Sequence, residues 1–464
     1  MPGFHIEHFG CRAARADGEA IAGRLRAYAE LEPLASDMVV VNTCSVTAEA
    51  DRAARAYIRR AHRRNPAAKI VITGCYAQRA PEELARMAGV AAVIGNSHKA
   101  LAPEIVLSLS RPAAHPSLVP VHSLLSAAAP LAAPIWSDDR FAHSFLEDPP
   151  LVPGAQTRPN LKIQEGCANR CTFCVIPQTR GPSKSLPAAS VFRQVEAFVA
   201  AGVKEIVLSG INLGHWGRDL PPEPGAPPSF SALVRAILDE TALPRLRLSS
   251  IEPMDWTGEL IALLREHGGA RICRHAHLPL QSGSDSVLRR MFRRYRPWHY
   301  ADKAAALIRA AGPDLTLGAD VMAGFPGETD GEFEETLAFI RELPFGYLHL
   351  FPFSPRPGTR AWALHAESGV PPAAVEERMA ALRSLAAGKV RAHRRRFIGR
   401  SLAAITLHTP PALAAQGRTA ALTENFLPVE LDGCLPANEL LCVRVAGLNS
   451  DDTLVAGRGA RKSP

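Results

Sequence analysis

Six apolar or β-rich runs recur through the middle of the chain, and each is separated from the next by a stretch with helical periodicity. The runs cover Leu161–Ile163, Glu205–Ser209, Leu246–Ile251, His275–Leu280, Leu315–Met322 and Tyr347–Phe353. Helical patterns lie between them, as at Ala188–Ala201 and Thr329–Glu342. Six such units predict a partial (β/α)6 barrel over residues 160–396, whose reactive groups lie at the carboxyl ends of its strands.

Two smaller blocks flank this region. Residues 1–107 alternate β-rich runs with amphipathic stretches, for example Met38–Thr43 followed by Ala48–Arg64, which predicts a small parallel α/β domain. Residues 397–464 hold short β-like pieces between Gly and Pro turns, which predicts a small β-barrel. Residues 108–159 are rich in Ala, Pro and Ser, a composition typical of a linker. The expected fold class is therefore α/β with a C-terminal β-barrel.

The composition indicates a protein with reduced thiols and an anionic partner. The start of the chain has no signal-peptide pattern, and the apolar tract Ser123–Ile135 is broken by prolines and too short to span a membrane, so we expect a cytoplasmic protein. Nine cysteines is an odd number, which argues against a complete disulfide framework. Lys and Arg number 53 against 45 for Asp and Glu, a net charge of +8.

Three cysteines follow the first strand of the predicted barrel. Cys167, Cys171 and Cys174 form a C-x3-C-x2-C run. Three thiolates this close together can bind three irons of a cubane cluster and leave the fourth iron open. Zinc is the alternative metal, but structural zinc normally takes four protein ligands, and no nearby Cys or His completes the set.

Three further cysteines lie far apart in sequence but in equivalent places. Cys11, Cys44 and Cys75 each come just after a predicted strand of the N-terminal domain. Neighbouring parallel strands end at a common crevice, so these thiols can converge there. A single cysteine after a strand is usually a packed thiol, and this interpretation is equally open for all three. Cys273, Cys434 and Cys442 have no ligand-like spacing and are interpreted as ordinary thiols.

The C-x3-C-x2-C run resembles that of the radical S-adenosylmethionine (SAM) enzymes, and the segments around the dispersed cysteines are similar to those of the methylthiotransferase family. These segments are Phe9–Arg12, Val41–Thr47 and Thr73–Gln78. The resemblance implies SAM and two 4Fe–4S clusters as cofactors. Cys167, Cys171 and Cys174 would bind the cluster that cleaves SAM to a 5′-deoxyadenosyl radical, and Cys11, Cys44 and Cys75 an auxiliary cluster that is methylated on a sulfur.

Further segments resemble one subgroup, which acts on N(6)-threonylcarbamoyladenosine next to the tRNA anticodon, at position 37. They include CSVTAEAD from Cys44 to Asp51 and LHLFPFSPRPGTR from Leu348 to Arg360. The implied reaction replaces the hydrogen on adenine carbon 2 with a methylthio group, using an electron donor such as a flavodoxin or ferredoxin and a sulfur source. The alternatives are an isopentenyladenosine or ribosomal-protein substrate, or a non-catalytic iron–sulfur protein that binds RNA.

Polar residues at the ends of the predicted barrel strands are candidate SAM ligands. Ser209 and Gly210 end the second strand, Ser250 and Glu252 the third, and Gln281 the fourth. Each could equally cap a strand or turn. The turn Gly324–Thr329 could approach the adenine of SAM, and a strand-to-helix turn with Thr329 as N-cap explains it nearly as well. No catalytic side chain is assigned.

Arginines gather in three groups that suit RNA phosphates. The first, Arg52, Arg55, Arg59 and Arg63, lies on one stripe of a predicted helix. The second spans Arg289–Arg296, and the third includes Arg394, Arg395 and Arg396 just before the β-barrel. A charge run is usually a solvated face, but three groups in one basic chain favour tRNA as partner. The last block resembles a TRAM domain, in which Phe426 is a base-stacking candidate or, more simply, a core residue.

Overall fold

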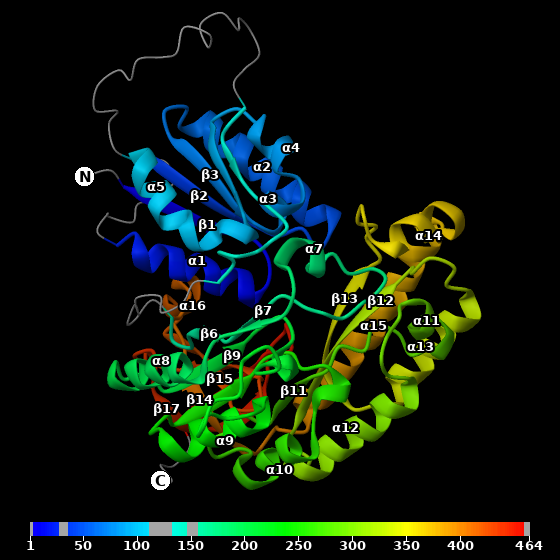
Figure 1. Ribbon diagram of the computed structural model, residues 1–464. Coiled ribbons are helices and arrows are strands. Elements are labelled where there is room, and N and C mark those ends of the chain that lie inside the picture. Colours follow the sequence, from blue (N-terminus) through cyan, green and yellow to red (C-terminus); the bar gives the residue numbers. More distant parts are fainter. Residues whose placement is uncertain (1–2, 27–35, 111–131, 146–155, 459–464) are drawn as a thin grey trace, which may run out of the picture. The chain divides into compact units, whose positions relative to one another are not determined.

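The computed structural model describes residues 3–26, 36–110, 132–145 and 156–458 (Figure 1). The chain divides into two compact units. The first consists of Met1–Leu151 together with Glu165–Asn169 and Cys174–Ser183, and the second of Val152–Gln164, Arg170–Phe173 and Lys184–Pro464. The boundary thus differs from the expected one, since two short pieces of the 160–396 block pack with the N-terminal unit.

The first unit is built on a parallel sheet whose five strands follow one another in sequence order. They are β1 (Phe4–His8), β2 (Met38–Thr43), β3 (Lys69–Gly74), β4 (Val90–Gly95) and β5 (Ile135–Trp136). The helical segments are α1 (Arg12–Arg24), α2 (Ala48–Arg64), α3 (Cys75–Arg79), α4 (Pro81–Ala85), η1 (Asn96–Leu101), α5 (Ala102–Ser110) and α7 (Ile176–Arg180). Strand β5 lies within the predicted linker and forms the edge of the sheet.

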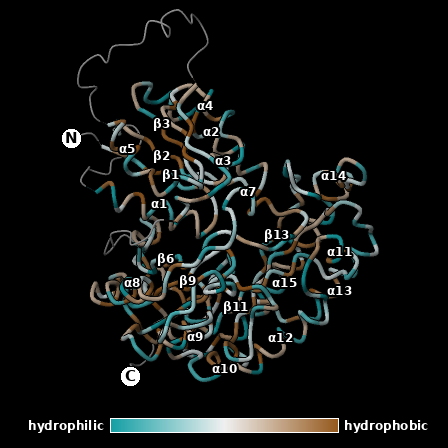
Figure 2. The backbone as a smooth tube through the Cα atoms, viewed as in Figure 1, coloured by the Kyte–Doolittle hydropathy of each residue, from teal (hydrophilic) through white to brown (hydrophobic). Residues whose placement is uncertain are grey.

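Alternating side chains place apolar groups on both faces of this sheet. Val39 and Ile70 pack with Ile58 of α2 on one face, while Val40 packs with Ile21 of α1 on the other. Figure 2 shows the central strands of this sheet as hydrophobic. A strand covered on both faces carries a continuous apolar run, which is why Met38–Thr43 contains so few polar residues.

The second unit contains the six predicted parallel strands. Strands β10, β9 and β6 form one three-stranded sheet and β11, β12 and β13 another, and a parallel bridge joins Leu246 to Ile272. Their bounds are β6 (Asn160–Lys162), β9 (Glu205–Ser209), β10 (Arg245–Leu248), β11 (His275–His277), β12 (Thr316–Ala323) and β13 (Phe345–Pro352). The shorter pieces are β7 (Gln164–Glu165), β8 (Lys184–Ser185), η2 (Leu213–His215) and η3 (Pro253–Asp255).

Helices follow these strands and cover their outer faces (Figure 1). They are α8 (Ala188–Ala200), α9 (Phe230–Glu240), α10 (Gly258–His267), α11 (Asp285–Arg290), α12 (Pro297–Ala311), α13 (Asp330–Glu342), α14 (Arg360–Ser368) and α15 (Pro372–Arg395). Thr329 caps α13, because its hydroxyl accepts a hydrogen bond from the Glu332 amide at 3.3 Å. The capping explanation of this turn is therefore confirmed. No helix of the described residues is long and apolar enough to cross a membrane.

A closed five-stranded barrel ends the chain, as predicted. Its elements are β14 (Ser401–Thr406), α16 (Pro411–Ala414), β15 (Arg418–Thr423), β16 (Pro428–Asp432), β17 (Leu440–Leu448) and β18 (Leu454–Arg458). The turn after β15 binds the six-stranded part of the second unit: Glu424 accepts hydrogen bonds from Arg274, one of them from Nε at 2.8 Å, and Asn425 donates to the Asp314 carbonyl at 3.0 Å. The barrel is thus joined firmly to the six-stranded part of its unit.

Candidate functional site

The three dispersed cysteines lie at the carboxyl ends of adjacent strands of the first unit. Cys11 follows β1 by two residues, Cys44 directly follows β2, and Cys75 directly follows β3. Gly10, with φ of +107°, leaves no room for a side chain, since an added Cβ would lie 2.7 Å from Cys44 Cβ. Asn96, after β4, donates to Cys75 Sγ at 3.4 Å. The predicted convergence of these strand ends is confirmed.

The surroundings of Cys44 disfavour a bare thiolate. Burial, together with repulsion from the nearby thiols of Cys75 and Cys11, raises the pKa of the Cys44 thiol to about 12. Three such thiolates cannot coexist unless cations neutralise them. Iron is a suitable cation, because thiolates are its ligands in cubane clusters.

A buried arginine supplies positive charge on the protein side. Burial alone would lower the pKa of the Arg180 guanidinium, but Cys75, Glu165, Asp17 and Cys11 together hold it well above its ordinary value. Arg180 Nη1 donates to Glu165 at 2.5 Å and to Asp17 at 3.1 Å, and Lys99 Nζ binds the same two carboxylates at 2.6 and 3.0 Å.

Two nitrogens of the Arg180 guanidinium take no part in these ion pairs. Arg180 Nε and Nη2 are buried and have no hydrogen-bond partner among the described residues. Buried guanidinium donors are normally satisfied. An anionic sulfur-rich group on Cys11, Cys44 and Cys75 would accept from them, so the residues present fit a cluster at this site.

The C-x3-C-x2-C run is shared between the two units. Cys167 and Cys174 belong to the first, where the Cys167 amide donates to the Gly181 carbonyl at 3.1 Å. Cys171 belongs to the second, where the neighbouring Thr172 amide donates to the Met291 carbonyl at 3.0 Å. All three thiols are half-buried, which leaves them accessible to ligands.

Cys171 has its own buried arginine. Arg293 Nη1 donates to Cys171 Sγ at 3.2 Å, and Nη2 binds Glu252 at 2.6 Å. Burial would lower the pKa of this guanidinium, but Tyr295, Glu252 and Cys171 raise it well above its ordinary value. A fixed positive charge beside Cys171 suits an anionic group bound there.

Unsatisfied polar atoms line the carboxyl ends of the strands in the second unit. Ser209 Oγ, both side-chain atoms of Asn212, and Gln281 Oε1 are buried without a hydrogen-bond partner among the described residues. Gln164 Oε1 accepts from the Ile211 and Asn212 amides at 2.9 and 2.6 Å and so fixes the loop after β9. Polar atoms left unpaired in this way fit a polar ligand such as SAM.

The predicted SAM ligands have different surroundings. Ser209 and Gln281 are buried, and Gln281 has a φ of +65°, a strained conformation for a non-glycine residue. Gly210 packs closely, since an added Cβ would lie 3.0 Å from Gln164 Cβ. Ser250 is half-buried. Glu252 is already paired with Arg293. The assignment of all five to SAM stays a prediction.

The predicted RNA-binding arginines divide into exposed and paired side chains. Arg52 and Arg59 are exposed on α2, whereas Arg55 donates to the Tyr76 hydroxyl and to Glu83. In the C-terminal group, Arg394 donates to the Asp452 carbonyl and Arg396 to the Pro313 carbonyl, both at 2.7 Å, while Arg395 is exposed. Their contact with RNA stays a prediction.

Sequence reasoning did not assign a local role to several of these residues. Arg293 stands in an arginine-rich run, which hid its position beside Cys171. Arg180 and Glu165 flank the C-x3-C-x2-C run in sequence, and this proximity was the available signal. Phe426 is neither a free stacking residue nor a core residue of the β-barrel: its ring stacks on His275 with centroids 4.3 Å apart.

Family comparisons agree with this geometry. Residues 161–340 match the radical SAM superfamily, and residues 3–95 match "Uncharacterized protein family UPF0004". Among solved structures, the radical S-adenosylmethionine methyltransferase TsrM from Kitasatospora setae is similar in fold, with a TM-score of 0.56 and 15% identity over 79% of this chain and 78% of TsrM.

Two relatives extend the match to most of the chain. "Threonylcarbamoyladenosine tRNA methylthiotransferase MtaB" of Rickettsia prowazekii is 33% identical over 96% of this chain and 94% of its own length. "tRNA-2-methylthio-N(6)-dimethylallyladenosine synthase" of Parafrankia sp. is 33% identical over 86% of this chain and 76% of its own length. With both sets of cysteines in place, this chain belongs to the radical SAM methylthiotransferase family, which includes the MtaB proteins.

Proposed function

We propose that this enzyme converts N(6)-threonylcarbamoyladenosine next to the tRNA anticodon to its 2-methylthio derivative. The observation that carries the proposal is the match to MtaB proteins along nearly the whole chain, at 94% of the Rickettsia protein's length and 99% of that of Aquifex aeolicus. The matched family models, at residues 3–95 and 161–340, include the two sets of cysteines. We further propose a cytoplasmic location, with a small electron-transfer protein and a sulfur source as partners.

The target bond explains the cofactors. The C–H bond at adenine carbon 2 is neither acidic nor electrophilic, so acid–base side chains cannot activate it. SAM bound to a 4Fe–4S cluster supplies a carbon radical that can break such a bond. The chain's own residues then position and shield the reactants.

Separate roles for the two thiol sites follow from their surroundings. Cys167, Cys171 and Cys174 would hold the cluster that binds SAM, with Arg293 donating a hydrogen bond to Cys171 Sγ and the polar ends of β9 and β11 holding the rest of SAM. Cys11, Cys44 and Cys75 would hold an auxiliary cluster, with Arg180 and Asn96 directing hydrogen bonds to its sulfurs. This second cluster is part of the proposal.

The alternative substrate is isopentenyladenosine in tRNA, because relatives named for the dimethylallyl product match this chain at 33% identity. Mass spectrometry of nucleosides from the tRNA of a deletion strain separates the two. Loss of 2-methylthio-threonylcarbamoyladenosine, and its return with the wild-type gene, is the expected result. An unchanged level of that nucleoside would refute the substrate assignment, and loss of the isopentenyl derivative instead would favour the alternative.

A non-catalytic iron–sulfur protein is distinguished by a direct assay. Anaerobically reconstituted protein should bind roughly eight irons if both clusters are cubanes. With a reductant it should release 5′-deoxyadenosine from SAM. Iron binding without this release would contradict the enzymatic assignment.

A further inference from the structure

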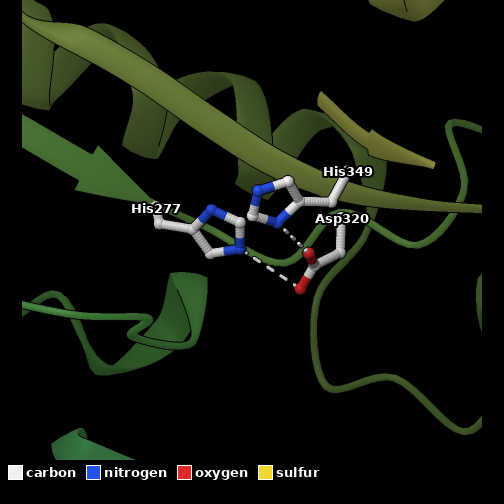
Figure 3. A group of neighbouring side chains, drawn as sticks. All are labelled: His277, Asp320 and His349. Carbon is white, nitrogen blue, oxygen red and sulfur yellow. Dashed lines mark hydrogen bonds and ion pairs between the residues drawn. The ribbon is translucent and has the colours of Figure 1, made fainter. Parts of the chain in front are cut away.

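Two histidines flank an aspartate on the strands β11, β12 and β13 of the second unit (Figure 3). His277 Nε2 lies 3.2 Å from one carboxylate oxygen of Asp320, and His349 Nδ1 lies 3.2 Å from the other. Figure 3 shows the two rings next to each other, with a dashed line from each to the carboxylate. The proposed thiol sites and SAM contacts do not use this group.

The hydrogen bonds among His277, Asp320 and His349 have consistent donors and acceptors. A carboxylate only accepts, so both imidazoles donate to Asp320. His277 Nδ1 then accepts from the Tyr347 hydroxyl at 3.0 Å, and this hydroxyl accepts from His275 Nε2 at 2.7 Å. The chain of donors therefore runs from buried His275 to Asp320, and it fixes the ring of His277.

His349 is the exposed end of this group. Its side chain is 62% exposed, while that of His277 is 8% exposed. Since Nδ1 is bound to Asp320, Nε2 is left without a hydrogen-bond partner among the described residues. Burial would raise the pKa of the Asp320 carboxyl, but the hydrogen bonds from His277 and His349 hold it well below its ordinary value.

The group lies beside the polar strand ends described above. The Gln281 amide donates to the Asp320 carbonyl at 2.8 Å, and Gln281 bridges Val321. Along β12, Asp320 alternates with Ala319 and Val321, which are fully buried. Asp320 therefore lies on the opposite face of β12 from Ala319 and Val321, and its backbone is bound to the candidate SAM ligand Gln281.

We propose that His349, oriented by Asp320, binds the carboxylate of the threonylcarbamoyl group of the substrate. The proposal rests on the function proposed above and names the contact that selects its substrate. A protonated imidazole donates a charge-assisted hydrogen bond to a carboxylate. The dimethylallyl group is apolar and offers no acceptor to Nε2, so the same contact favours threonylcarbamoyladenosine over isopentenyladenosine.

A metal ion is the competing occupant, since two imidazoles and a carboxylate are ligands for divalent metals. The three ligand atoms lie within 4.8 Å of one another. Metal binding is therefore one outcome of the test below.

The test is a thermodynamic cycle like that of a double mutant, in which one substitution in the protein is combined with one chemical change in the substrate. Wild-type enzyme and His349→Ala are assayed on tRNA carrying threonylcarbamoyladenosine and on the same tRNA with its threonyl carboxylate methyl-esterified. We expect His349→Ala and esterification each to lower kcat/KM by roughly 10- to 100-fold, and the two together to cost little more than either alone. His349→Gln, which keeps a donor, should recover part of the loss.

Controls separate the possible failures. His267→Ala, at the end of the outer helix α10, should behave as wild type, and all variants should release 5′-deoxyadenosine. If the wild-type enzyme does not convert the unesterified tRNA, the proposed function fails. If it does, and His349→Ala is equally active or the two penalties add in full, only the carboxylate contact is overturned. Stoichiometric Zn²⁺ binding by protein with all six cluster cysteines changed to Ser, lost in His349→Ala, would replace the anion with a metal.

Discussion

The two thiol sites differ in how the chain builds them. Three separate strands deliver Cys11, Cys44 and Cys75, and two of these thiols are buried. One short loop delivers Cys167, Cys171 and Cys174, and all three remain half-buried. The first site depends on a finished sheet, whereas the second is already encoded in local spacing. Under the proposed function, burial suits the auxiliary cluster and accessibility suits the cluster that would bind SAM.

The arginines beside the two sites also differ in the burial of their ion-pair partners. Arg180 is fully buried and shares two carboxylates with Lys99, a network whose four side chains are almost completely inaccessible. Arg293 is held by Glu252, which is 22% exposed. A rigid ionic network thus supports the dispersed thiols, and a single, more accessible pair supports Cys171. Three changes test this comparison.

The largest effect is expected from the cysteines themselves. Cys171→Ala should abolish release of 5′-deoxyadenosine, because the SAM-binding cluster loses a ligand. Cys44→Ala should spare this release but stop methylthio transfer, which is measured as the 2-methylthio nucleoside by mass spectrometry. If both variants lost SAM cleavage equally, the proposed division of labour would be wrong.

An intermediate effect is expected from the arginines. Arg180→Gln removes one cation from the buried carboxylates of Asp17 and Glu165, and breaking a buried ionic network typically costs about 3–5 kcal/mol. Urea unfolding of the apoprotein measures this loss. Arg293→Gln should destabilise less, since Glu252 can be solvated, but should slow SAM cleavage roughly tenfold through the lost charged hydrogen bond.

Exposed arginines serve as matched controls for these two variants. Arg140, with a side chain 84% exposed, lies in the first unit and Arg294, also exposed, in the second, and their Gln variants should be close to wild type in both assays. Equal loss of stability in Arg180→Gln and Arg293→Gln would remove the contrast between the two sites.

The smallest effect is expected at the surface of the first unit. Arg52→Ala with Arg59→Ala should weaken tRNA binding and reduce the slope of log K against log salt by roughly 1.5, since each phosphate contact contributes about 0.7–0.9. Arg391→Ala should leave the slope unchanged, because Arg391 is bound to Asp452 at 2.9 Å. Fluorescence anisotropy at several salt concentrations measures both. An unchanged slope in the α2 variant would exclude this helix as a phosphate-binding face.

The sequence predicted what depends on periodicity and local spacing. The six central strands, the N-terminal parallel sheet and the C-terminal barrel all lie close to their predicted positions, because each buried strand needs a continuous or alternating apolar run. The convergence of Cys11, Cys44 and Cys75 followed from their common position after strands. Such reasoning succeeds where the position of a residue depends only on the helix or strand to which it belongs.

Side-chain partners across elements could not be predicted in this way. Arg293 belongs to a charge run, yet the turn after α11 buries it against Cys171. His277, Asp320 and His349 are separated by 43 and 29 residues, and only the register of β11, β12 and β13 brings them together. Strand β5 was hidden because only two residues of a proline-rich segment pair with β4.

The turn after β15 has a mechanical consequence. The residues Glu424–Phe426 contact Arg274, His275 and Asp314 of the six-stranded part, so the small barrel and the six strands form a single body. In the proposed function, a tRNA held on that barrel presents its anticodon loop at one fixed reach. The distance from the barrel to the reaction site would then select the nucleotide first, and the chemistry of the base would select it second.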